Sequence, residues 1–132
     1  PDLARRLKET ATRAPVYSKL DATRDAARRA GCIILFKGVD TIIAHPDGRC
    51  CVHAAIWDTA VPWLATAGAG DVLAGLIAGL LARPIPNEID IMAAVEVAVW
   101  LHVQCARSFG PGLIAEDLPE ELPKVLRQIL RS

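Results

Sequence analysis

Apolar positions in the first part of the chain follow a helical spacing that is interrupted at one glycine. Residues 22–30 alternate small apolar side chains with basic ones at that spacing, and Gly31 follows the last of them, as is typical of a helix end. Ser18 precedes Asp21 by three positions, an arrangement typical of a helix start. The pattern therefore predicts an amphipathic helix over 22–30. The leucine spacing in residues 1–13 predicts another short helix.

A continuous apolar run and two shorter ones follow that glycine. Residues 32–36 read Cys-Ile-Ile-Leu-Phe, which is typical of a strand buried on both faces, as strands of parallel sheets are. Residues 41–44 and 49–53 are further strand candidates, and the His-Pro-Asp-Gly between them favours a tight turn. A helix, a glycine and a buried strand form part of a right-handed crossover unit. We therefore expect a parallel core strand followed by a hairpin.

The second half of the chain carries helical patterns. Residues 72–82 are an unbroken apolar run directly after two glycines and an aspartate, which predicts a buried helix. Asn87 or Asp90 can cap a long helix that ends near Phe109, and residues 119–130 form a closing helix. Strands followed by helices of this length predict an α/β fold in which helices pack on the sheet.

Composition narrows the class of protein. The chain has 132 residues, which is a typical length for one domain. The charges of its 15 basic and 15 acidic residues cancel, so overall charge does not favour nucleic acid as a partner. We find no signal peptide and no apolar run long enough to span a bilayer. The four cysteines lack metal-binding spacing, which favours free thiols in a reducing compartment. We expect a single domain over 1–132, cytoplasmic, without a membrane partner or a metal site.

The candidate chemistry is concentrated in residues 66–71, Thr-Ala-Gly-Ala-Gly-Asp. A glycine turn that opens a helix exposes backbone N–H groups at the positive end of the helix dipole, which suits a phosphate. Asp71 stands at the edge of this turn, where a carboxylate can cap the helix or accept a proton from an attacking hydroxyl. The spacing excludes the P-loop, which needs a lysine after its glycines, and the dinucleotide fingerprint, which needs a glycine at Leu73.

A second candidate group is residues 37–41, Lys-Gly-Val-Asp-Thr, directly after the expected core strand. Ligands of open α/β sheets bind beyond the carboxyl ends of strands, and a lysine there can neutralise phosphate charge. Each group alone has an ordinary structural interpretation, as a capped loop or a surface lysine. Together they predict nucleotide-dependent phosphoryl transfer. His53, at a strand end, and His102, among apolar helix positions, are interpreted as structural histidines.

Three blocks of the sequence, residues 37–48, 64–82 and 109–119, resemble successive motifs of one family. In this order and spacing they resemble the ADP/ATP-dependent NAD(P)H-hydrate dehydratases, a branch of the ribokinase-like kinases. The early strands of that family have no counterpart here, so the chain resembles its C-terminal half. The resemblance implies part of a ribokinase-like three-layer sandwich, and it leaves a functional role open for His102.

The resemblance also implies an activity and the residues that carry it. Relatives of this kind repair hydrated NADH or NADPH by a dehydration coupled to ADP or ATP hydrolysis, with Mg²⁺ accompanying the nucleotide. Asp71 would contact the hydrate and activate its hydroxyl, and Gly68 would help to hold the transferring phosphoryl group. The residues that would contact the adenine nucleotide are Lys37, Gly38, Val39, Asp40, Thr41 and Gly70.

Two other functions stay open at this point. Another ribokinase-like small-molecule kinase would share the glycine turn, and a catalytically silent fragment could serve as a nucleotide-binding or assembly module. Part of a sheet exposes an edge strand and an apolar face, which other protein surfaces tend to cover. We therefore expect a homo-oligomer or pairing with a missing N-terminal half.

Overall fold

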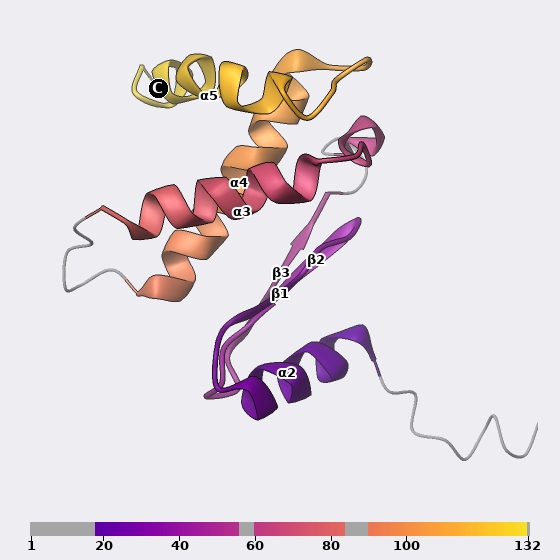
Figure 1. Ribbon diagram of the computed structural model, residues 1–132, viewed down its shortest axis with the longest axis vertical. Helices are drawn as coiled ribbons and strands as arrows, with labels where there is room; N and C mark the ends of the chain where they lie inside the picture. Colours follow the sequence, from indigo (N-terminus) through magenta and orange to yellow (C-terminus); the bar gives the residue numbers. More distant parts are fainter. Residues whose placement is uncertain (1–17, 56–59, 84–89, 132) are drawn as a thin grey trace, which may run out of the picture.

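The computed structural model describes residues 18–55, 60–83 and 90–131, so the helix expected over 1–13 and the candidate cap Asn87 lie outside the described residues. Within these ranges the sheet has three strands, with α2 on one side and both α3 and α4 on the other, and α5 packs on α4 (Figure 1). The elements are, in order, α2 (Lys19–Ala30), β1 (Ile34–Phe36), β2 (Asp40–Ala44), β3 (Cys50–Ala54), η2 (Pro62–Leu64), α3 (Ala69–Leu81), α4 (Ile91–Phe109) and α5 (Asp117–Ile129). The expected α/β class is confirmed.

The direction of β1 differs from the expectation of a parallel core strand. β1 pairs with β2 antiparallel, with Leu35 opposite Ile43. Only residues 37–39 connect the two strands, whereas a parallel pair needs a crossover of about a dozen residues or more. β1 is also less buried than a strand covered on both faces, because Phe36 remains 50% exposed. The sheet is therefore a small antiparallel one, packed by helices.

The expected hairpin is present as β2 and β3. Its register places Thr41 opposite His53, and its turn contains Gly48 at a φ of 98°, a conformation that favours glycine. The Arg49 guanidinium binds the carboxylates of Asp47 in the turn and of Asp90 at the start of α4. These ion pairs join the turn of the hairpin to the beginning of the long helix.

The helix ends follow the predicted capping chemistry. The Asp21 N–H donates to Ser18 Oγ at 3.1 Å, and Gly31 ends α2 in the left-handed conformation. Asp90 caps α4 by accepting a hydrogen bond from the Met92 N–H at 3.2 Å. α5 begins two residues earlier than expected, at Asp117. Local sequence therefore placed most of these boundaries within a few residues.

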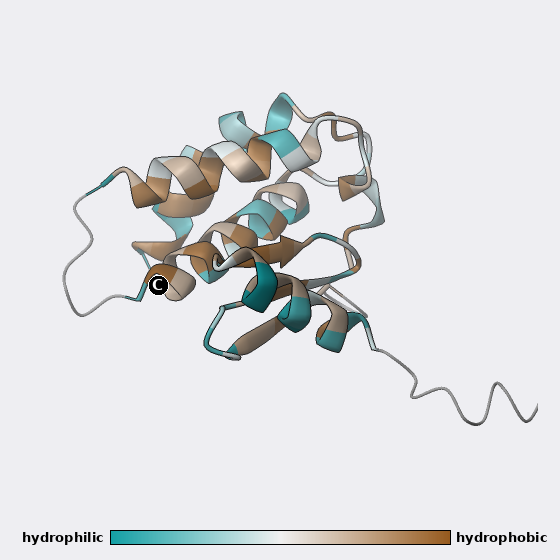
Figure 2. Ribbon diagram, turned by 60° about the horizontal axis from the view of Figure 1, so that its bottom comes forward, coloured by the Kyte–Doolittle hydropathy of each residue, from teal (hydrophilic) through white to brown (hydrophobic). Residues whose placement is uncertain are grey.

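The helix α3 is less buried than its apolar sequence suggested. Within it only Ala69 and Leu73 are buried, since α4 covers one side of the helix. The opposite side is lined by exposed small residues, which are Ala74, Gly75, Ala78 and Gly79. Figure 2 shows that α3 is brown or pale beyond its first turn, in contrast to the teal outer face of α2. In the described ranges, no helix is long and apolar enough to cross a membrane.

The core lies on both sides of α4. One cluster joins the sheet to α3 and α4, and its buried members are Ile43, Leu73, Met92, Val95, Ala98 and Val99. The other cluster joins α4 to η2, the start of α3 and α5. Because α4 contributes to both clusters, it positions the hairpin and the glycine turn relative to each other. Side chains from the middle of α4 can therefore reach both candidate groups.

Candidate functional site

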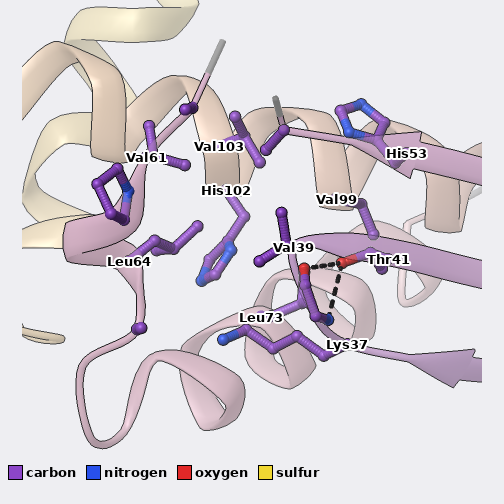
Figure 3. A pocket seen from close by; sticks show the side chains of 15 residues that line it. Lys37, Val39, Thr41, His53, Val61, Leu64, Leu73, Val99, His102 and Val103 are labelled. Atoms are coloured by element: carbon purple, nitrogen blue, oxygen red, sulfur yellow. Dashed lines mark hydrogen bonds between the residues drawn. The ribbon is translucent and has the colours of Figure 1, made fainter. Parts of the chain in front are cut away.

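A cavity of about 290 Å³ lies where the loop after β1 meets η2 and α4. Four side chains bring polar groups to its lining, and these are Lys37, Thr41, His53 and His102 (Figure 3). The remaining wall is largely apolar and includes Val39, Ala55, Val61, Leu64, Leu73, Val99 and Val103. A mostly apolar cavity with a few convergent polar groups is typical of a site for a small organic ligand.

The loop between β1 and β2 is held in a tight conformation beside this cavity. Thr41 Oγ1 donates to the Gly38 carbonyl at 3.1 Å and lies 3.4 Å from the Gly38 nitrogen. Lys19 Nζ donates to the Asp40 carbonyl and lies 4.6 Å from the centre of the Phe36 ring. A Cβ added to Gly38 would lie 2.7 Å from Lys19 Nζ. The glycine therefore makes room for the lysine that holds the loop.

Most of the predicted Lys37–Thr41 group lies at the cavity. Lys37, Gly38, Val39 and Thr41 line it, whereas Asp40 does not. Asp40 is exposed at the start of β2, with its backbone carbonyl turned to Lys19. The cavity therefore brings together four of the five residues.

The predicted glycine turn lies next to the cavity but does not line it. Gly68 precedes α3 at a φ of 82°, and the N–H groups of Asp71 and Val72 donate to its carbonyl at 3.0 and 3.1 Å. Asp71 is exposed in the first turn of α3. A Cβ added at Gly70 would meet nothing within 4 Å. The turn thus has open space at Gly70 and an exposed acidic residue at Asp71.

His102 connects the cavity to this turn. The His102 side chain lines the cavity from α4 (Figure 3), and the residue is 2% exposed. Its Nε2 donates to the Ala69 carbonyl at 2.8 Å. The pKa of His102 is lowered to about 4, mainly by burial; the Ala69 hydrogen bond opposes the shift, and the charge of Lys37 adds to it. The imidazole is therefore neutral near pH 7. His102 is therefore a buried, hydrogen-bonded histidine, as the structural interpretation expects, and it also lines the cavity.

His53, which the sequence analysis interpreted as a structural histidine, lines the cavity. Its Nδ1 is buried and has no hydrogen-bond partner in the described part of the chain. The hairpin offered a signal, because counting outward from the Pro-Asp-Gly turn places position 53 opposite position 41. For the apolar residues of η2, no sequence pattern indicated that they would line a cavity. Among the described residues, no group of three or more His, Cys, Asp or Glu side chains could hold a metal ion.

Comparison with known proteins gives consistent matches. The NAD(P)H-hydrate dehydratase family model matches residues 4–127. The chain is 36% identical, over 80% of its length, to an ADP-dependent (S)-NAD(P)H-hydrate dehydratase of Xanthomonas campestris. It is 35% identical, over 97% of its length, to the bifunctional NAD(P)H-hydrate repair enzyme Nnr of Moorella thermoacetica. It spans 36% and 23% of these two relatives, respectively.

A solved structure has the same fold over the shared part. The ADP/ATP-dependent NAD(P)H-hydrate dehydratase of Bacillus subtilis, co-crystallized with ATP/Mg²⁺ and soaked with CoA, superposes with a TM-score of 0.70 at 31% sequence identity. The match covers 84% of the present chain and 40% of the Bacillus protein. The chain therefore corresponds to a part of that longer fold.

Proposed function

Because this chain belongs to the NAD(P)H-hydrate dehydratase family, we propose that it carries the adenine-nucleotide site and the catalytic aspartate of an ADP- or ATP-dependent dehydratase. The substrate is hydrated NADH or NADPH. The observation that carries the proposal is the placement of the Lys37–Thr41 loop at a cavity beside the Gly68–Asp71 turn. These two groups lie apart in the sequence and are neighbours of one helix, α4, in the fold.

The nucleotide is proposed to lie across the cavity and the turn. The apolar wall formed by residues such as Leu64 and Val99 suits the flat face of a purine. Lys37 supplies a cation at the cavity, and the open space at Gly70 lets phosphate oxygens approach the backbone. The other predicted contacts, Gly38, Val39 and Thr41, lie at the cavity, while Asp40 and Gly68 would act through their backbone.

Asp71 is proposed as the general base for the hydrate. Its exposed carboxylate would accept the hydroxyl proton while the hydroxyl oxygen attacks the terminal phosphorus of the nucleotide, whose bond to the leaving phosphate oxygen breaks. The bond between the ring carbon and the phosphate oxygen then breaks, phosphate leaves with the electron pair, and loss of a proton from the adjacent ring carbon forms the double bond that restores the dihydronicotinamide. Mg²⁺ would neutralise phosphate charge in this reaction. No cluster among the described residues suits Mg²⁺, so we assign it no protein ligand.

We also propose that this chain is covered by further protein, either a second copy or the remainder of a longer chain. The exposed apolar side of α3 and the half-exposed Phe36 on the edge strand β1 support this. Edge strands and contiguous apolar surfaces of this kind promote association. The remainder of the longer fold would also supply part of the hydrate site.

Calorimetric titration of ADP, ATP and AMP with Mg²⁺ tests the proposed nucleotide site. We expect Lys37→Ala to weaken binding about tenfold, because a charge-assisted contact to phosphate is lost. Asp71→Asn should leave binding within about threefold, because Asp71 serves the chemistry. Absence of nucleotide binding to the unmodified chain would overturn the proposal in favour of an assembly module. Comparable binding together with phosphorylation of an unrelated hydroxyl compound would favour another ribokinase-like kinase.

A further inference from the structure

The hydrogen bond between His102 and Ala69 joins two segments that are 33 residues apart in the sequence. His102 lies in the middle of α4, whereas Ala69 is the first residue of α3 and sits between Gly68 and Gly70. The Ala69 side chain is completely buried. The backbone carbonyl of Ala69 accepts a hydrogen bond from His102 Nε2 at 2.8 Å. Ala69 is therefore the point at which the glycine turn is attached to the rest of the fold.

The direction of this hydrogen bond follows from its chemistry. A carbonyl oxygen only accepts, so Nε2 of His102 must carry the proton. The ring is neutral because it is buried and faces the charge of Lys37. The stable form is thus the Nε2–H tautomer, which leaves Nδ1 as an acceptor.

Packing also holds the turn, because the Ala69 side chain is buried in the apolar cluster around α4 and Gly68 faces Ala115. Gly68 precedes Ala69 in the left-handed conformation, which favours glycine, and Gly70 follows it in the first turn of α3. The hydrogen bonds from the Asp71 and Val72 N–H groups to the Gly68 carbonyl close the turn internally. The hydrogen bond from His102, in contrast, joins the turn to a side chain that lines the cavity.

We infer that His102 is a positioning residue whose Nε2–H holds the Ala69 carbonyl and thereby fixes the Gly68–Asp71 backbone relative to the cavity. This inference rests on the proposed function, in which the nucleotide lies across the cavity and the turn. His102 also lines the cavity, so one side chain contacts both parts of the site. Loss of its N–H donor would leave the cavity in place and allow the turn to shift away from it.

Two substitutions by side chains of similar length distinguish a hydrogen-bonding role of His102 from a packing role. His102→Gln keeps an N–H donor near the position of Nε2, whereas His102→Met fills similar space without a donor. We expect His102→Gln to bind ADP within about threefold of the unmodified chain and His102→Met to bind about tenfold more weakly, the equivalent of one hydrogen bond. A packing role alone predicts the reverse order, because Met is the better residue for an apolar interior.

A ligand-free measurement makes the result independent of the proposed function. Amide hydrogen exchange at Gly70 and Asp71 should be faster in His102→Met and close to normal in His102→Gln, after correction for global unfolding. Ser108→Ala serves as the control, since it removes a hydrogen bond from the same helix to Glu121 on α5, away from the cavity. It should change neither ADP binding nor exchange at the turn.

The possible outcomes are distinct. Equal exchange and equal ADP binding in the two His102 variants would overturn the inference and leave the nucleotide site intact. If the unmodified chain binds no ADP, the proposed function fails, and the exchange data alone decide whether His102 holds the turn. Faster exchange in both variants would also overturn the inference, because it would mean that a donor at this position is not sufficient.

Discussion

Thr41 and His53 lie directly opposite each other on β2 and β3, and both line the cavity. Directly opposed residues of an antiparallel pair point to the same face, so the hairpin brings a hydroxyl and an imidazole to one wall. Thr41 Oγ1 is bound to Gly38, whereas Nδ1 of His53 is buried without a partner in the described residues. The His53 imidazole therefore lines the cavity while its Nδ1 is an unsatisfied buried nitrogen.

Replacement of His53 is expected to change stability and binding in opposite directions. His53→Leu removes a buried polar atom without a partner and should raise the free energy of unfolding by about 1 kcal/mol. The same change should weaken ADP binding by about fivefold, because the ligand loses a polar contact. Urea unfolding and calorimetry measure the two effects. An unchanged affinity would mean that His53 only borders the ligand.

The glycine that opens α3 is expected to be intolerant of a side chain. Gly68 has a φ of 82°, and its added Cβ would lie 3.0 Å from the Cβ of Ala115, so Gly68→Ala should cost about 1–2 kcal/mol of unfolding free energy. Gly75 lies inside the same helix with open space around it, so Gly75→Ala should stabilise by about 0.5–1 kcal/mol. Urea unfolding of both variants checks the signs. Equal effects would contradict the turn geometry.

His102 is expected to make stability depend on pH. Its pKa is lowered from 6.5 to about 4 in the fold, so between these values the unfolded chain binds a proton that the folded chain does not. Its contribution is therefore fully present above pH 6.5 and is lost as the pH falls toward 4. The slope is at most about 1.4 kcal/mol per pH unit.

The His102→Gln variant isolates this effect, since the other titrating groups are unchanged. Unfolding free energies at pH 7, 6 and 5 should fall less steeply in the variant than in the unmodified chain. Parallel curves would show that His102 does not titrate between the two states as its burial requires.

The exposed side of α3 is expected to mediate association. Ala78→Arg places a charge among its small residues and should shift the species observed by size-exclusion chromatography with light scattering from oligomer to monomer. Glu120→Lys, at an exposed position of α5, is the control and should leave the mass unchanged. A monomeric unmodified chain would count against a second copy as the covering surface.

Features that depend on neighbouring residues could be predicted from the amino-acid order alone. The caps at Ser18 and Asp90 and the Pro-Asp-Gly turn were all predicted, because each involves groups a few residues apart. The family blocks were also recognisable, since they are contiguous strings. The residues of the glycine turn were therefore identified from the sequence, and the binding experiments test their proposed roles.

Features that depend on contacts between distant segments were decided by the tertiary structure. The apolar run of β1 is compatible with either strand direction, and only pairing with β2 made it antiparallel. The apolar sequence of α3 could not indicate which side α4 would leave exposed. The contact of His102 with Ala69 spans 33 residues and has no spacing pattern, because it exists only once α4 packs beside the turn. The physical reason is common to all three cases: helix and strand periodicity encode which side of an element is apolar, and long-range packing decides what that side meets.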